Sequence, residues 1–288
     1  MNPPGRTRLK AVQALMLAAV LIGPAGALAD ELVIGVTPGA LADSIEVAAR
    51  AARQDGLDVR VVEFSDWTTP NLALASGDLD LNYFQHKAFL DNAVAETGYD
   101  LVSVGIGILP NIGLYSSRYQ SFDALPDGAR VGIASDPVNQ GRGLLLLQQA
   151  GLITLTDGVA SHGTLDDVVE NPRELDFVEI EGPQLVRALD DVDLAQGYPA
   201  HYVNAGKPDI AGSALLYSGV EDTDFAIRFV SRKDNAQDPD IGRFIDIYQN
   251  DPAVRAEIHR AYAGNDALYS LPWEHREAAT QPADQTGK

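Results

Sequence analysis

Hydrophobic positions alternate between strand-like and helix-like spacing along the first third of the chain. Short apolar or alternating runs of strand length cover residues 31–36, 57–64 and 79–84. Apolar residues at helical spacing follow each of them, over residues 41–53, 71–76 and 87–96. Gly77 and Gly98 stand directly after two of these helices, where glycine favours termination. Strands that alternate with helices predict a parallel, doubly wound α/β sheet.

The alternation of strands and helices is interrupted twice by long extended runs of apolar residues, at residues 101–116 and 225–231. Between them the pattern restarts, and we expect a strand at 130–134, a loop at 135–141, a helix at 142–150, a strand at 177–180, a helix near 183–189 and a strand at 192–195. Helices at 241–250 and 252–263 follow the second run. Extended runs can carry a chain between two lobes, and 288 residues is a length typical of two domains.

Both ends of the chain are expected to lie outside the fold. The N-terminus has three basic residues, an apolar run and then small residues that a signal peptidase reads, at Arg6, Arg8, Lys10, 12–22 and 27–29. We therefore predict a signal peptide over residues 1–29, although an uncleaved anchor remains open. The polar residues 276–288 are predicted to be a disordered tail. Lobe 1 is then assigned to residues 30–112 and 224–275, and lobe 2 to residues 113–223.

The composition limits which partners this protein can bind and in which cellular compartment it works. The chain carries 41 acidic against 21 basic residues, a formal charge of −20, which repels nucleic acid and anionic lipid. It has no cysteine, which excludes disulfides, thiolate catalysis and a lipid anchor on an N-terminal cysteine. We therefore expect a soluble periplasmic protein, a monomer with no nucleic-acid partner.

The sequence offers no catalytic or metal-binding constellation. The nucleophile-elbow, phosphate-loop, dinucleotide-loop and zinc-protease motifs are all missing. The five histidines, at 86, 162, 201, 259 and 275, do not recur at ligand spacing. The acidic clusters lack the glycine and distal glutamate of a calcium loop and are interpreted as solvated surface. We expect no metal, no cofactor and no enzymatic activity.

A first candidate recognition segment is Asp136-Pro-Val-Asn139-Gln-Gly-Arg142, which joins a predicted strand to a predicted helix. This position brings backbone N–H groups and a positive helix end to the sheet edge where α/β proteins bind ligands. Arg142 could clamp a carboxylate with two hydrogen bonds, and Asn139 could add a donor and an acceptor. The residues alone leave open a capped helix whose arginine forms a surface salt bridge.

A second candidate segment, residues 82–89, contains three aromatic rings and a histidine at the entry to a helix. Phe84 and Phe89 suit an apolar ligand tail, and Trp67 follows a neighbouring strand end and could share the same wall. Packing in the core is the alternative interpretation for both phenylalanines.

Four segments together resemble the MetQ/NlpA family, the methionine-binding proteins that deliver substrate to ABC importers. They are Phe84-Gln-His-Lys87, Asp136–Arg142, Asp167-Val-Val-Glu-Asn-Pro172 and Pro183-Gln-Leu-Val-Arg-Ala-Leu-Asp190, within a resemblance that covers residues 32–263. It implies a two-lobed, type II periplasmic-binding-protein fold, each lobe a sheet flanked by helices. The ligand would lie in the cleft between the lobes, and the extended runs would be the two crossing segments.

The resemblance also implies roles for individual residues. Arg142 and Asn139 match the carboxylate-binding loop of the family, and Phe84 and His86 match its side-chain pocket. Phe89 and Trp67 stand where the family commonly has tyrosine.

The chain departs from the family pattern at two places. It has Gly197-Tyr-Pro-Ala-His-Tyr202 where members commonly read Val-Ile-Asn-Thr-Thr-Tyr, and Phe225-Ala-Ile227 where they read Tyr-Val-Asn. Each lost amide partner of an ammonium group costs about 1–3 kcal/mol. We therefore expect Tyr198 to reshape the pocket, and a ligand other than tightly bound free methionine. Arg228 is either a second anion contact or a surface residue.

The leading hypothesis is a solute-binding protein of an ABC importer. It would bind a small amino-acid-like, methionine-related or carboxylate ligand and deliver it to a permease in the inner membrane. An exported enzyme that uses His86 with a nearby acid, and an interaction protein that transports nothing, are the alternatives.

Overall fold

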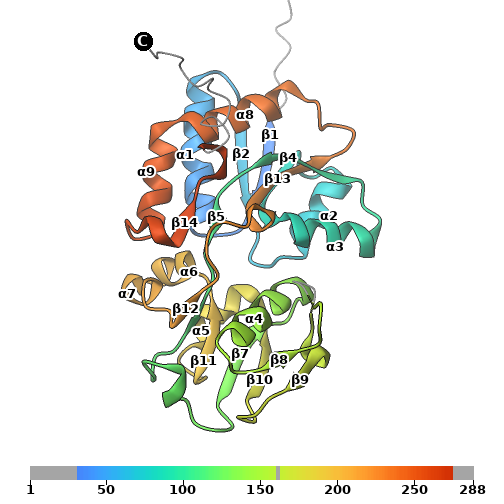
Figure 1. The fold of residues 1–288 in the computed structure, drawn as a ribbon. Coiled ribbons are helices and arrows are strands. Elements are labelled where there is room, and N and C mark those ends of the chain that lie inside the picture. Colours follow the sequence, from blue (N-terminus) through green and yellow to red (C-terminus); the bar gives the residue numbers. More distant parts are fainter. Residues whose placement is uncertain (1–30, 160–162, 275–288) are drawn as a thin grey trace, which may run out of the picture.

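The computed structural model describes residues 31–159 and 163–274, which form two five-stranded sheets, one above the other in Figure 1. We call the parts built around them lobe 1 and lobe 2. The lobe 1 sheet has the order β2 (Val59–Glu63), β1 (Leu32–Val36), β3 (Leu81–His86), β13 (Ile227–Arg232), β4 (Leu101–Ile106). The lobe 2 sheet has the order β10 (Asp176–Ile180), β7 (Arg130–Ala134), β11 (Leu194–Gly197), β6 (Gly113–Tyr115), β12 (Leu216–Tyr217).

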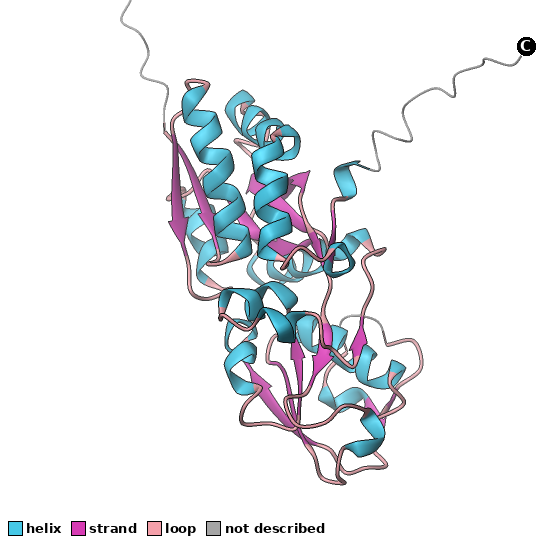
Figure 2. Ribbon diagram, turned by 90° about the vertical axis from the view of Figure 1, so that its left-hand side faces the viewer, coloured by secondary structure: helices cyan, strands magenta, loops and turns pink. Residues whose placement is uncertain are grey.

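Helices cover both faces of the lobe 1 sheet (Figures 1 and 2). On one side lie α1 (Ala40–Gln54), α8 (Pro239–Asn250) and α9 (Pro252–Ala261), and on the other α2 (Thr69–Ser76) and α3 (Lys87–Thr97). The apolar positions of α1 recur every three to four residues, so Ile45, Ala48, Ala49 and Ala52 share one buried face. This face packs against α8, α9 and β2, and it belongs to the largest core cluster, which extends into lobe 2.

Lobe 2 carries the helices α4 (Pro137–Gln149), α5 (Leu185–Ala188), α6 (Pro199–Asn204) and α7 (Pro208–Ala211). A small sheet pairs β8 (Thr154–Leu155) with β9 (Val168–Glu170), and another pairs β5 (Leu109–Pro110) with β14 (Tyr269–Ser270). The leucines Leu144, Leu146 and Leu147 of α4 enter the core of this lobe. Ala200 and Tyr202 of α6 belong to a larger core cluster that contains residues of both lobes, and α6 contacts α1 and α9 of lobe 1.

The sheets are mixed rather than parallel, which corrects one expectation. β13 runs antiparallel to both β3 and β4, and β6 runs antiparallel to β11 and β12. Residues 225–231 were expected to be a crossing, but most of them form the central strand β13, whose Phe229 and Val230 are fully buried. A buried central strand and a crossing segment are both continuous apolar runs, so the pattern alone does not separate them. The crossings lie instead between β4 and β6 and between β12 and β13.

Helix α4 begins five residues earlier than expected, at Pro137 rather than at Arg142. The carboxylate of Asp136 accepts a hydrogen bond from the N–H of Asn139 at 2.9 Å, and proline at the first helical position has a suitable backbone angle. Gly141 and Gly143 lie inside the helix although glycine disfavours it. A Cβ on Gly143 would stand 2.5 Å from Gln196 Oε1, so close packing on β11 explains the second glycine.

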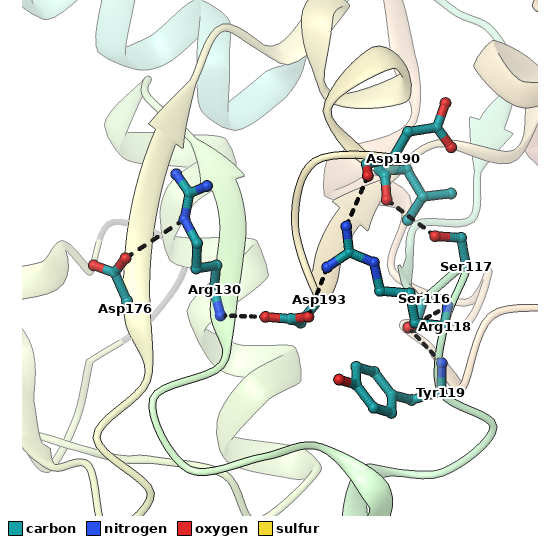
Figure 3. Close-up of polar contacts among 9 residues, drawn as sticks. Ser116, Ser117, Arg118, Tyr119, Arg130, Asp176, Asp190 and Asp193 are labelled. Atoms are coloured by element: carbon teal, nitrogen blue, oxygen red, sulfur yellow. Dashed lines mark hydrogen bonds and ion pairs between the residues drawn. The ribbon is translucent and has the colours of Figure 1, made fainter.

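A polar network fixes the start of lobe 2 to the segment that enters β11 (Figure 3). The Asp193 carboxylate accepts hydrogen bonds from Arg118 Nη1 and from the N–H of Arg130, both at 2.9 Å. Arg118 Nη2 also donates to the carbonyl oxygen of Asp190 at 2.9 Å. Ser116 Oγ accepts from the N–H groups of Arg118 and Tyr119, which shapes the turn after β6. The network therefore anchors the turn after β6 to the segment between α5 and β11 and to the start of β7.

The predicted signal peptide (residues 1–29) and the predicted tail (residues 276–288) lie outside the described residues. Within residues 31–159 and 163–274, every helix is too short or too polar to cross a bilayer. The proposed lobe boundaries stay a prediction.

Candidate ligand-binding site

A cavity of about 710 Å³, including its part open to solvent, lies between the two lobes. Its walls come from the carboxyl ends of β1, β3 and β11, from the first turns of α4 and α6, and from β13. Strand carboxyl ends are where open α/β sheets bind ligands. The lining residues are Thr37, Pro38, Ala40, Leu41, Trp67, Phe84, Gln85, His86, Phe89, Pro110, Asn139, Arg142, Tyr198, Pro199, Ala200, His201, Ile227 and Tyr262.

Seven of the eight residues predicted from the sequence meet at this cavity. They are Trp67, Phe84, His86, Phe89, Asn139, Arg142 and Tyr198. Arg228 is not among the lining residues, and its Nη2 donates a hydrogen bond to the carbonyl oxygen of Thr223 at 2.6 Å. The ligand-binding role of all eight stays a prediction, and the position of Arg228 adds no support to its role as an anion contact.

Aromatic rings form one wall of the cavity and bridge the two lobes. Phe84 and Phe89 contact each other edge to face with ring centroids 5.9 Å apart, and Trp67 meets Phe89 at 6.4 Å. Trp67 of lobe 1 also contacts Tyr198 of lobe 2 at 5.9 Å. Such a wall offers a large apolar surface to a ligand side chain.

Asn139 is held by hydrogen bonds from both lobes. Its Oδ1 accepts from the hydroxyl of Tyr198 at 3.0 Å and lies 3.3 Å from His86 Nε2. His86 Nδ1 accepts the N–H of Phe89, so the ring proton is assigned to Nε2, which donates to Asn139. Asn139 Nδ2 donates to both carboxylate oxygens of Asp136, at 3.0 and 3.2 Å. The Oδ1 of this amide therefore has both of its acceptor sites occupied, and it ties lobe 1 to lobe 2.

Arg142 is a buried cation without an anionic partner in the described part of the chain. Its side chain is 5% exposed, and its guanidinium carbon lies 4.1 Å from the ring centroid of Phe225. Within residues 31–159 and 163–274 its guanidinium makes no hydrogen bond or ion pair, and Phe225 supplies a cation–π contact. Burial lowers the pKa of Arg142, while Asp222 and Asp136 act in the opposite direction. A buried, unpaired guanidinium is suited to a carboxylate ligand.

The lobes contact each other closely at two glycines. A Cβ on Gly182 of lobe 2 would stand 2.1 Å from the Trp67 ring of lobe 1, and one on Gly39 would stand 1.8 Å from Asn204 Nδ2. Gly39 also has a φ of 97°, which favours glycine. These contacts require that the cleft be closed in this structure.

Several lining residues were missed by sequence reasoning. Thr37 and Leu41 follow the end of β1, so the rule that ligands lie at strand carboxyl ends could have indicated them. Phe225, which does not itself line this cavity, was noted only within the extended run 225–231 and as a departure from the family pattern, although its ring covers the Arg142 guanidinium. Tyr262 arrives from the end of α9, far along the chain, and no local signal indicates it.

His86, which is buried, and His201, which is partly buried, predict a dependence of stability on pH. Burial is the largest cause that lowers the pKa of His86 to about 3 and that of His201 to about 4. In the unfolded chain both titrate near 6.5, so below that pH unfolding takes up protons that the folded state excludes. The free energy of unfolding should fall by about 1.4 kcal/mol per pH unit per histidine as the pH drops from about 6.5 to about 5. Above 6.5 neither histidine contributes.

Urea denaturation of ligand-free protein at about pH 7.5 and about pH 5.5 measures this slope. The His201→Gln variant should lose about half of it. Equal slopes in both proteins would contradict the assignment.

Comparison with known proteins gives a family and relatives. A family model described as NlpA lipoprotein matches residues 32–268. The D-methionine-binding lipoprotein MetQ of Yersinia pestis is 40% identical over 263 residues, which cover 89% of this chain and 95% of that protein. A nutrient-binding protein from Burkholderia cenocepacia, solved with methionine, is 34% identical with a TM-score of 0.75, over 81% of this chain and 97% of that one.

An ABC transporter periplasmic substrate-binding protein from Coxiella burnetii gives the same coverage, 81% and 97%, with 34% identity and a TM-score of 0.75. The predicted two-lobed α/β fold of the type II binding proteins is thereby confirmed. These relatives are named as binding proteins rather than enzymes.

The predicted localisation as a soluble periplasmic protein is contradicted by the relatives. The matching family and the Yersinia pestis relative are both named lipoproteins, which are proteins that carry lipid. The prediction rested on the lack of cysteine in the 288 residues, an observation that the names of the relatives do not alter. The names of the relatives overturn the localisation without indicating where a lipid would be attached.

The resemblance noted in the sequence is confirmed by these matches. The family model spans more than half of the chain, and the identity of 40% extends over nearly all of the Yersinia pestis relative. This chain belongs to the NlpA lipoprotein family.

Proposed function

We propose that this chain is the solute-binding protein of an ABC importer and takes a small, amino-acid-like or carboxylate ligand with an apolar tail. The observation that carries the proposal is the buried Arg142 guanidinium, which lines the interlobe cavity without an anionic partner in the described part of the chain. The printed names of the relatives support it, because they describe methionine binding and ABC transport.

Each side chain has a role in this proposal. Arg142 binds the ligand carboxylate, and Phe84, Phe89 and Trp67 surround the apolar tail. Asn139, held by His86 and Tyr198, links the lobes once the ligand is enclosed. We further propose that residues 30–112 and 224–275 form lobe 1, that residues 113–223 form lobe 2, and that the monomer delivers its ligand to a membrane permease.

The geometry of His86 argues against an enzyme on this scaffold. Both ring nitrogens are engaged, Nδ1 with the N–H of Phe89 and Nε2 with Asn139. A general base needs a free nitrogen and a pKa near the working pH, whereas burial lowers the pKa of His86 to about 3. We therefore propose a binding protein without catalytic activity.

The test is a thermal-shift screen of protein unfolded in guanidinium, dialysed and refolded to remove bound material. A ligand at 100 times its Kd adds about 2.7 kcal/mol to the stability of the folded state. We expect at least one small carboxylate to raise the Tm and to be recovered chemically unchanged by mass spectrometry. Conversion of the ligand, or no response to any small carboxylate by a correctly refolded protein, would overturn the proposal.

A further inference from the structure

The cavity contains one full positive charge and no full negative charge. Arg142 is the cation, and the lining residues include neither aspartate nor glutamate. Asp136 and Asp222 influence the pKa of Arg142, but neither lines this cavity, and Asp222 lies instead in a neighbouring cavity that Arg142 and Phe225 also line. Asp136 lies against Asn139, whose Nδ2 donates to both of its carboxylate oxygens. A ligand in this cavity therefore finds a partner for an anion and no counter-charge for a cation.

The neutral hydrogen-bond acceptors of Asn139 and His86 already have donors. Asn139 Oδ1 has two lone-pair sites, and the hydroxyl of Tyr198 and the Nε2–H of His86 take both. His86 Nδ1 accepts the N–H of Phe89. Neither side chain can accept a hydrogen bond from a ligand ammonium group without giving up a hydrogen bond that it already makes.

The part of the lining that β13 contributes is apolar. Ile227 lines the cavity, is 6% exposed and stands two residues after Phe225, whose ring covers the Arg142 guanidinium. The remaining acceptors among the lining side chains, such as the Thr37 hydroxyl and a ring nitrogen of His201, are uncharged. Enclosing an ammonium group among neutral and apolar groups carries a large desolvation cost.

We propose, on the basis of the proposed function, that the ligand is a monocarboxylate with an apolar tail and no free α-ammonium group. Two kinds of compound have this chemistry: 2-oxo or 2-hydroxy acids, in which the nitrogen is absent, and N-acylated amino acids, in which it is an amide. The carboxylate pairs with Arg142, and the tail packs on Phe84, Phe89 and Trp67. The α-substituent lies against Ile227 and the Tyr198 hydroxyl.

Calorimetric titration of stripped wild-type protein tests the proposal with matched compounds. For methylthioethyl, isobutyl and benzyl side chains, the free amino acid in both enantiomers is compared with its N-acetyl derivative, its 2-oxo acid and its methyl ester. At least one ammonium-free carboxylate should bind about tenfold or more tightly than the amino acid with the same side chain. The ester, which keeps the ammonium and loses the carboxylate, should not bind.

The outcomes separate this inference from the proposed function. If a free amino acid binds as tightly as its ammonium-free analogues, the inference is overturned and the proposed function stands. If no carboxylate binds to protein whose circular-dichroism spectrum shows that it is folded, both the inference and the proposed function are overturned. Preference for the 2-oxo or for the N-acetyl series identifies which kind of compound the site takes.

A variant supplies a second readout. Ile227→Asn places a neutral acceptor in the apolar wall, and Ile227→Leu is the matched control that keeps it apolar. The ratio of amino-acid affinity to ammonium-free affinity should rise by about fivefold or more in the asparagine variant alone. An unchanged ratio in a folded Ile227→Asn protein would contradict the role assigned to this wall.

Discussion

Replacing Arg142 with alanine is expected to weaken ligand binding by about 30-fold or more, the largest effect of any single substitution in the cavity. Removing one partner of a buried charge pair costs about 2–5 kcal/mol, because the ligand carboxylate would then be buried without a cation. Folding should be little affected. The guanidinium is buried without an anionic partner in the described part of the chain, so its removal also relieves a desolvation cost.

The comparison includes two further variants. Arg142→Lys keeps the positive charge but loses the planar pair of donors, so its affinity should lie between those of wild type and Arg142→Ala. Arg130→Ala removes an exposed arginine that does not line the cavity and whose partner is Asp176 (Figure 3), so this variant should bind as wild type does. Calorimetry measures the affinities and urea denaturation the stabilities. Wild-type affinity in Arg142→Ala would rule out the anion contact.

The parts of the fold that depend on local spacing were predictable from the sequence. The apolar face of α1 repeats with a helical period, and β1, β2 and β7 lie within a few residues of their expected positions. The same locality explains why the position of Arg142 near a sheet edge was predictable. A helix that directly follows a parallel strand must begin at that edge.

The parts that depend on distant contacts were not predictable. The antiparallel direction of β13 follows from the return of the chain from lobe 2, which no property of residues 225–231 encodes. Gly143 is tolerated inside α4 because Gln196 of β11 packs against it. The early start of α4, by contrast, follows from the local Asp136-Pro137 signal, which the sequence interpretation overlooked. The ring that covers the Arg142 guanidinium belongs to Phe225, which lies 83 residues further along the chain (225 minus 142). Tertiary contacts decide such features, and local propensity does not.

The second large effect is expected from Gly182→Ala, because this glycine provides the space in which Trp67 sits when the cleft is closed. An added Cβ would stand 2.1 Å from two carbons of the indole ring, and the ring also contacts Phe89 and Tyr198. A rigid ring held on both sides cannot move away without disturbing the wall of the cavity. Overpacking of this kind costs about 1–3 kcal/mol, and here the cost falls on the closed state alone.

The apparent Kd rises by the factor by which the closed state is depopulated, so affinity should fall by about 5- to 150-fold. The matched control is Gly242→Ala in α8, where an added Cβ meets no atom within 4 Å. Calorimetry gives the affinities, and small-angle scattering with and without ligand reports closure. We expect a ligand-induced decrease in radius of gyration in wild type and Gly242→Ala, but not in Gly182→Ala. If Gly182→Ala closes and binds as wild type does, the contact between Trp67 and Gly182 does not limit closure, and ligand affinity depends on the cavity contacts alone.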